Sequence, residues 1–132
     1  MAGPVPYLYL PGTAREALIT YQKVFGGELQ LSTYQEFQRT DGPGEAIAHG
    51  ELGGGPVQLF AADAVEGDPS LSMTGLHFAL LGTADPGTMR GWFEQLSAGG
   101  RVVDPLQVRP WGDSDGQVVD RFGVHWLIGY QG

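Results

Sequence analysis

The chain has 132 residues, a length that fits one domain with a sizeable core, and its 42% hydrophobic content argues against disorder. Its formal net charge of −8 argues against nucleic acid and anionic membranes as partners, because an acidic surface repels phosphate groups. The absence of cysteine excludes disulfides, thiolate metal sites and a cysteine nucleophile.

The first half of the chain is predicted to form a strand, a helix and three further strands. Thr13 and Glu16 match a capping box at the helix start, and the pair Gly26-Gly27 ends the helix. Apolar side chains recur at helical spacing on one face: Ala14, Ala17, Leu18, Tyr21, Val24 and Phe25. The predicted elements are a strand at 5–10, a helix at 13–25, and strands at 28–37, 47–52 and 56–61.

The second half of the chain is predicted to repeat this order. Asp85 is the expected N-cap of its helix, with Pro86 at the first helical position. A turn-rich loop at 110–116 (PWGDSDG) carries Asp113 and Asp115, which we expect to be solvated. The apolar face of the helix is predicted to be Met89, Trp92, Phe93 and Leu96. The predicted elements are a strand at 75–81, a helix at 85–97, and strands at 101–108, 117–120 and 124–130.

The repeated order of elements predicts the fold class. A βαβββ module that occurs twice indicates an α+β fold with two modules sharing one core. We expect a single domain over 1–132, with module one at about 4–62, a polar linker at 63–73 and module two at about 74–132. Folds of this kind favour a site in the groove between the modules.

Four stretches of the chain together resemble a known superfamily. They are residues 21–28 (YQKVFGGE), 49–52 (HGEL), 59–63 (LFAAD) and 119–128 (VDRFGVHWLI). The chain resembles the vicinal-oxygen-chelate superfamily of glyoxalases, bleomycin-resistance proteins and dioxygenases, and is most similar to its PhnB-like branch. The resemblance implies an eight-stranded half-open cup with the helices outside, a homodimer, and in many members one divalent metal held by four side chains.

The resemblance also places the four metal-ligand positions of the family on this chain. They fall at or beside Pro6, near Gln58, on His77 and on Leu127. His77 is a good ligand and Gln58 a weak one, whereas proline and leucine side chains do not bind metal. Because catalytic sites usually keep three protein ligands, we expect no metal cofactor. The alternative is a divalent ion with His77 and Gln58 among its ligands.

The histidines offer a second arrangement. If the relevant strand faces line the cup, then His49, Glu51, Gln58, His77 and His125 converge into a histidine-rich site suited to zinc, nickel or iron. Glu51 is then a candidate general base, because a carboxylate in a dry cup has a raised pKa. The alternative is that these are cavity-lining or surface histidines with ordinary hydrogen bonds.

Aromatic side chains are candidates for ligand stacking. Trp111 lies beside two aspartates and is expected either to close over a flat or cationic ligand or to anchor its loop. Tyr9 is expected to line the cup or its rim. Trp126 falls on the strand face opposite His125, so we expect it to pack under a helix.

These features favour a metal-independent protein that binds or sequesters a small cationic or aromatic molecule. The alternative is a divalent-metal lyase, isomerase or ring-cleaving dioxygenase, with His77 as a ligand. We expect a homodimer, as the resemblance implies. We expect it in the cytoplasm, because no stretch reads as a signal peptide or a membrane span. The candidate ligand-binding residues are His77, His49, Gln58, Tyr9, Trp111 and His125.

Overall fold

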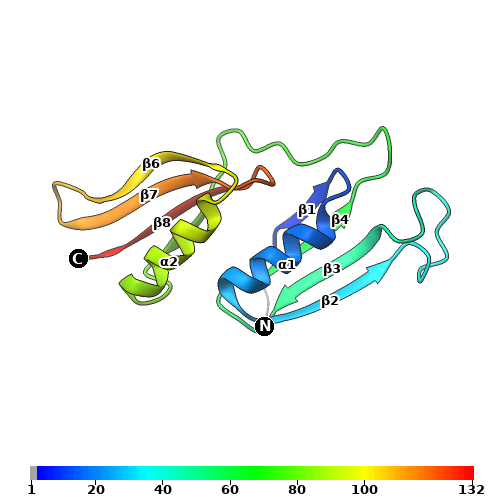
Figure 1. The fold of residues 1–132 in the computed structure, drawn as a ribbon, viewed down its shortest axis with the longest axis horizontal. Coiled ribbons are helices and arrows are strands. Elements are labelled where there is room, and N and C mark those ends of the chain that lie inside the picture. The colour runs from blue at the N-terminus through cyan, green and yellow to red at the C-terminus, as the bar shows by residue number, and fades with distance from the viewer. Residues whose placement is uncertain (1–2) are drawn as a thin grey trace. The chain divides into compact units, whose positions relative to one another are not determined.

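The computed structural model describes residues 3–132 and shows two compact units, one ending at Leu71 and the other beginning at Ser72 (Figure 1). Each unit contains one helix and one four-stranded sheet. Within the described part of the chain, neither helix is both long and apolar enough to cross a bilayer.

Unit 1 is a βαβββ module. Its elements are β1 (Tyr7–Leu10), α1 (Ala14–Phe25), β2 (Glu28–Thr33), β3 (Ile47–Gly53) and β4 (Leu59–Asp63). The sheet order is β1-β4-β3-β2, with β1 parallel to β4 and the other pairs antiparallel. Figure 1 shows α1 lying over one face of this sheet.

Unit 2 repeats the topology of unit 1. Its elements are β5 (Phe78–Leu81), α2 (Pro86–Ser97), β6 (Arg101–Val108), β7 (Asp113–Val119) and β8 (His125–Gln131). The sheet order is β5-β8-β7-β6, again with one parallel pair, β5 and β8. The predicted α+β fold with two βαβββ modules is therefore confirmed, while the joining of the sheets into one eight-stranded cup stays a prediction.

Both helices bury the faces that the apolar spacing predicts. The predicted apolar residues of α1 and of α2 are all buried, each 9% exposed or less. In unit 1 the helix approaches the sheet so closely that a Cβ on Gly50 would lie 2.5 Å from Leu18 Cδ1. Glycine at this position of β3 therefore lets the Leu18 side chain of α1 pack directly on the strand backbone.

The start of α1 differs from the prediction. Thr13 has φ −115° and ψ 12° and makes no capping hydrogen bond through its side chain, so the part of the capping box predicted for Thr13 is wrong. Asp63 at the end of β4 caps the helix instead, because its Oδ1 accepts a hydrogen bond from Ala14 N at 2.9 Å. Its Oδ2 accepts a second hydrogen bond, from Ile47 N at 2.8 Å. Its backbone carbonyl accepts from Tyr34 Oη at 2.7 Å. This buried carboxylate therefore connects the helix to two strands.

The second strand of unit 1 is shorter than predicted. The prediction ran over 28–37, but β2 ends at Thr33 because a local turn follows. Thr33 N donates to Glu36 Oε1 at 2.8 Å, and Glu36 N donates to Thr33 Oγ1 at 3.1 Å. The reciprocal pair of hydrogen bonds turns the chain, which leaves Phe37 52% exposed in the turn.

Other predicted strands are shifted at their ends. The fourth strand, predicted at 56–61, is β4 at Leu59–Asp63, so Gln58 precedes the strand. The fifth, predicted at 75–81, begins at Phe78, so His77 also lies one residue before its strand.

The start and the core of unit 2 agree with the prediction. Asp85 caps α2, since its Oδ2 accepts from Thr88 N at 3.1 Å. Trp126 is buried on the helix-facing side of β8, opposite His125, as predicted. Its indole Nε1 donates to Asp120 Oδ2 at 2.8 Å, so the buried carboxylate of unit 2 anchors the core tryptophan.

Candidate functional site

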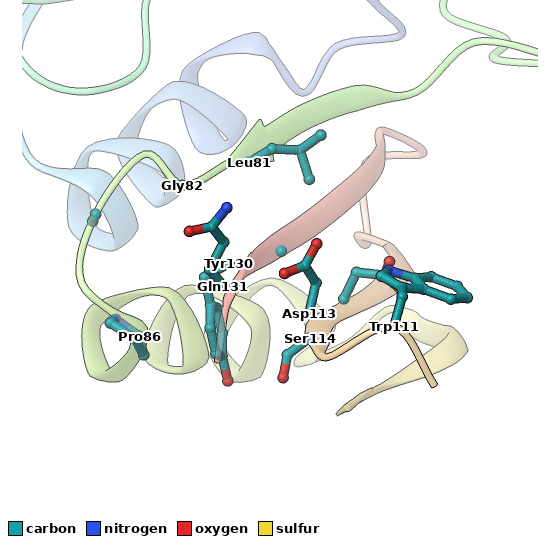
Figure 2. A pocket seen from close by; sticks show the side chains of 11 residues that line it. Leu81, Gly82, Pro86, Trp111, Asp113, Ser114, Tyr130 and Gln131 are labelled. Carbon is teal, nitrogen blue, oxygen red and sulfur yellow. The ribbon is translucent and has the colours of Figure 1, made fainter. Parts of the chain in front are cut away.

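A cavity of about 480 Å³ lies within unit 2, at the end of the sheet where β7 begins and β8 ends (Figure 2). Gly129 forms part of its wall, and a Cβ there would lie 2.9 Å from the carbonyl oxygen of Ser114 and 3.0 Å from Asp115 Cβ. The glycine therefore leaves no room for a side chain where β8 packs against β7 in this wall. Its other lining residues include Leu81, Pro86, Trp111, Asp113, Asp115, Tyr130 and Gln131.

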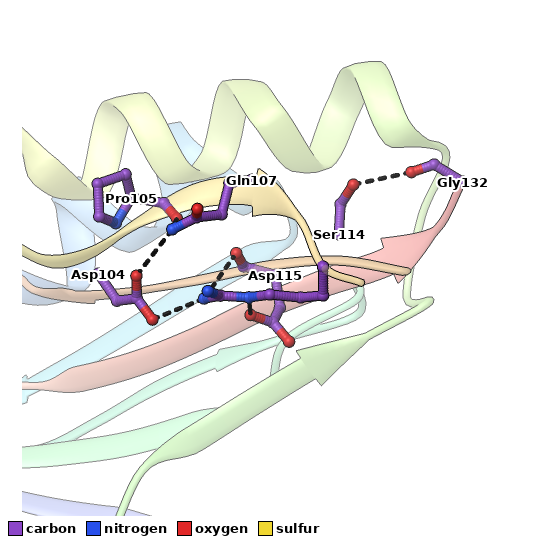
Figure 3. A network of polar contacts seen from close by, with 7 residues as sticks. Asp104, Pro105, Gln107, Ser114, Asp115 and Gly132 are labelled. Atoms are coloured by element: carbon purple, nitrogen blue, oxygen red, sulfur yellow. Dashed lines mark hydrogen bonds and ion pairs between the residues drawn. The ribbon is translucent and has the colours of Figure 1, made fainter. Parts of the chain in front are cut away.

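One of the two aspartates of the cavity is neutralised by an arginine. Arg109 Nε donates to Asp115 Oδ1 at 2.7 Å, and Arg109 Nη2 donates to Asp104 Oδ2 at 2.6 Å (Figure 3). Gln107 Nε2 donates to the other oxygen of Asp104 at 3.0 Å. The hydrogen bond to Asp115, followed by the one to Asp104, raises the pKa of Arg109. The guanidinium therefore stays charged and holds both aspartates in place.

The other aspartate keeps its charge available. In the described residues, the Asp113 carboxylate has no hydrogen bond and no ion pair, and it lines the cavity. Figure 2 shows Asp113 between Trp111 and Gln131 in the view. The Trp111 side chain is 68% exposed. An unpaired carboxylate beside an accessible indole is suited to a cation that also carries apolar surface.

The prediction that Asp113 and Asp115 lie in a turn is wrong, although both side chains remain partly exposed. The turn is shorter than 110–116, because Gly112 N donates to Arg109 O at 2.9 Å and Arg109 N to Asp113 O at 2.7 Å. Strand β7 therefore begins at Asp113. The i, i+2 spacing places both aspartates on one strand face, which sequence reasoning missed because it gave the whole segment to a loop.

In unit 1, His49 and Glu51 lie together, as their spacing on one strand predicts. His49 Nε2 lies 3.0 Å from Glu51 Oε1, and His49 Nδ1 lies 2.8 Å from Tyr7 Oη. The rings of Tyr7 and Tyr9 stack with centroids 4.8 Å apart and an interplanar angle of 19°. Burial raises the pKa of Tyr7, and the electrostatic effect of the neighbouring Tyr9 raises it further. The phenol of Tyr7 therefore keeps its proton at neutral pH.

In unit 2, His77 and His125 form a second pair, with ring centroids 4.2 Å apart. His125 Nε2 is buried and has no hydrogen-bond partner among residues 3–132. Burial lowers the pKa of His125, and the electrostatic effects of His77 and Arg101 lower it further. The neutral form of the ring is therefore favoured.

Each unit brings together two of the side chains that the sequence predicts as candidate metal ligands. Unit 2 pairs His77 with His125, and unit 1 pairs His49 with Glu51. Gln58 is exposed and lies outside a strand. Over the described part of the chain, no group of three or more histidine, cysteine, aspartate or glutamate side chains is placed to hold an ion. Neither unit alone therefore supplies the three protein ligands of a catalytic metal site, and convergence of the predicted residues stays a prediction.

Comparison with known proteins gives consistent matches. Residues 6–128 match the Glyoxalase/Bleomycin resistance protein/Dioxygenase superfamily. Protein YjdN of Escherichia coli K12 is 28% identical over 137 residues, covering 93% of this chain and 91% of that protein. The crystal structure of PA1353 from Pseudomonas aeruginosa is 30% identical, covers 99% of this chain and 98% of its own, and has a TM-score of 0.82. A PhnB protein from Bacillus cereus is similar in fold, with 18% identity, coverage of 98% and 99%, and a TM-score of 0.82.

Proposed function

Because the chain belongs to the Glyoxalase/Bleomycin resistance protein/Dioxygenase superfamily, we propose that it binds a small organic cation in the cavity of unit 2 without needing a metal. The observation that carries this proposal is the unpaired carboxylate of Asp113 beside the exposed indole of Trp111. The ligand would pair its positive charge with Asp113 and place its apolar part against Trp111.

The charges around the cavity support a cation rather than an anion. The nearby guanidinium of Arg109 forms ion pairs with Asp104 and Asp115. Because its charge is already balanced, it offers little attraction to an anionic ligand. The net charge of −8 adds a long-range attraction for cations. A volume of about 480 Å³ falls within the range of small-molecule sites.

Benzyltrimethylammonium is a suitable probe, with neopentylbenzene as its uncharged counterpart of the same shape. Trp111 is the exposed tryptophan, while Trp92 and Trp126 are buried, so quenching of indole fluorescence reports binding at the cavity. We expect Asp113→Asn to weaken binding of the cation about tenfold, the usual order for one charge-assisted contact. Trp111→Ala should remove the fluorescence response and weaken binding measured by calorimetry.

Glu94→Gln is the matched control, because it removes one negative charge from an exposed position of α2 that does not line the cavity. It should leave the affinity near that of the wild type. Equal binding of the cation and neopentylbenzene, or unchanged affinity in Asp113→Asn, would overturn the proposal.

A second candidate is a divalent-metal lyase, isomerase or dioxygenase, which the contact between His77 and His125 favours. Two imidazoles are fewer ligands than such a site needs, so further donors would have to come from outside this pair. Elemental analysis after loading with nickel, zinc, manganese and iron(II) tests it. Near-stoichiometric metal that falls in His77→Ala supports this candidate, whereas no metal under any loading excludes it.

We also propose that the protein is a homodimer, as the resemblance to the superfamily implies. Exposed apolar side chains in unit 2, among them Val102, Val103 and Val108, are consistent with surface that a second chain covers. A monomer mass by light scattering at micromolar concentration would contradict this proposal.

A further inference from the structure

Three side chains of unit 1 form a continuous chain of hydrogen bonds across the sheet. A glutamate carboxylate only accepts hydrogen bonds, so Glu51 Oε1 fixes the proton of His49 on Nε2. The other ring nitrogen, Nδ1, is then an acceptor, and Tyr7 Oη donates to it at 2.8 Å. Both protons of the chain therefore point the same way, from Tyr7 toward Glu51.

The tyrosine end of this chain is open to a ligand. Tyr7 and Tyr9 line a cavity of about 530 Å³ within unit 1, and Arg39 lines the same cavity. The Tyr9 side chain is 50% exposed and stacked on Tyr7, so it offers a ring for a planar molecule. Tyr7 Oη already uses its O–H to donate a hydrogen bond to His49 Nδ1, so its remaining capacity is to accept a hydrogen bond from a ligand.

We propose that Tyr7, His49 and Glu51 form a proton-accepting site that binds a planar molecule with an acidic hydroxyl, namely a phenol or an enol. The ligand hydroxyl donates to Tyr7 Oη while its ring lies against Tyr9. This site is built from residues of unit 1 and shares none of the residues that line the cation cavity of unit 2.

The proton transfer balances without any other reactant. The O–H bond of the ligand breaks and a new O–H bond forms on Tyr7, while the original phenolic proton of Tyr7 moves to His49 Nδ1. The products are a bound phenolate or enolate and an imidazolium, and Glu51 stabilises the imidazolium through Nε2–H. No electron is gained or lost.

The surrounding groups carry both signs of charge. Besides Glu51, the groups that act on the pKa of Tyr7 are Tyr9 on β1, Arg39 in the segment after β2, and Tyr34. The cavity is also lined by the aspartates Asp41, Asp63 and Asp68. Phe60 on β4 contributes a ring 5.4 Å from that of His49. Arg39, paired with Asp41 at 2.6 Å, lines the same cavity and opposes the rise in the pKa of Tyr7, so it would also stabilise a ligand anion there.

4-Nitrophenol tests the proposal because its anion absorbs visible light. At a pH below the pKa of the free dye, excess protein should increase the absorbance of the anion. 4-Nitroanisole, which has the same ring but no hydroxyl proton, should bind about tenfold more weakly. Tyr7→Phe should remove the colour change, and Glu51→Gln should reduce the anion fraction because the imidazolium loses its anionic partner.

Glu28→Gln is the matched control for Glu51→Gln, since it removes one negative charge from an exposed position of unit 1 that does not line this cavity; it should behave like the wild type. Circular dichroism checks that each variant is folded, and Glu51→Gln keeps the test decisive if Tyr7→Phe is unstable. A saturated complex without colour change, equal binding of 4-nitroanisole, or no binding of 4-nitrophenol would overturn the proposal.

Discussion

The two units have the same order of strands and helix, yet their helices begin in different ways. In unit 2, α2 is capped locally by Asp85, the residue just before it. In unit 1, the residue before α1 makes no capping bond, and the first N–H of the helix donates to Asp63, 49 positions away in sequence. One helix start is therefore encoded by neighbouring residues and the other by the assembled sheet.

This difference indicates that the N-terminus of α1 forms together with its sheet. Asp63 also accepts from Ile47 N, so its two carboxylate oxygens bridge α1 and β3. Removing a buried acceptor leaves its donors unpaired, which costs more than losing an exposed cap. Mutations at the two helix starts should therefore differ in size and in how far their effects spread.

The largest effect is expected at Asp63. We expect Asp63→Ala to lower the free energy of unfolding by about 3–5 kcal/mol, because two buried N–H groups lose their acceptor. Urea denaturation gives the loss, and amide hydrogen exchange should show faster exchange at Ala14 and Ile47. A loss no larger than that of Asp85→Ala would contradict the contrast between the helices.

A smaller effect is expected at Asp85. Asp85→Ala should lower Tm by about 3 °C at neutral pH, the usual size for an exposed N-cap. Thr13→Ala is the matched control at the other helix start and should change stability by less than about 0.5 kcal/mol, because Thr13 makes no capping bond.

The effect of Asp85 should also depend on pH. Hydrogen bonds from Thr88, side chain first and then backbone, lower the pKa of Asp85 in the folded protein. Its contribution is therefore present above the pKa of the unfolded chain and is lost as pH falls through the folded pKa. The Tm difference between wild type and Asp85→Ala should vanish in acid; a constant difference would show that the charge plays no part.

The smallest effect is expected at His125, whose surroundings differ from those of His49. His49 has partners on both ring nitrogens, whereas buried His125 Nε2 has none among the residues described. Because the pKa of His125 is lowered, folding favours its neutral form, so stability should fall as pH drops from about 6.5 through the folded pKa. His125→Phe should flatten this part of the stability curve; an unchanged slope would contradict the assignment.

Residue patterns predicted most of the fold. Helical spacing identified the buried faces of α1 and α2, and the alternation around His49 placed it on the same strand face as Glu51. Strand ends were predicted less well, because side-chain contacts such as that of Glu36 with Thr33 turned the chain earlier than the apolar pattern suggests. The candidate sites were predicted only in part: His49 with Glu51 was expected, but the roles of Tyr7 and Arg109 were not.

The sequence by itself determined what depends on near neighbours: the repeated module, the helix faces, the Asp85 cap and the acidic charge. Only the tertiary structure decided which distant residues meet. The register that aligns Tyr7 with Phe60 and Phe60 with Glu51 brings Tyr7 to His49, and the end of β4 brings Asp63 to α1. The physical reason is that strand register and helix packing are set by the whole buried surface, which no local stretch of sequence specifies.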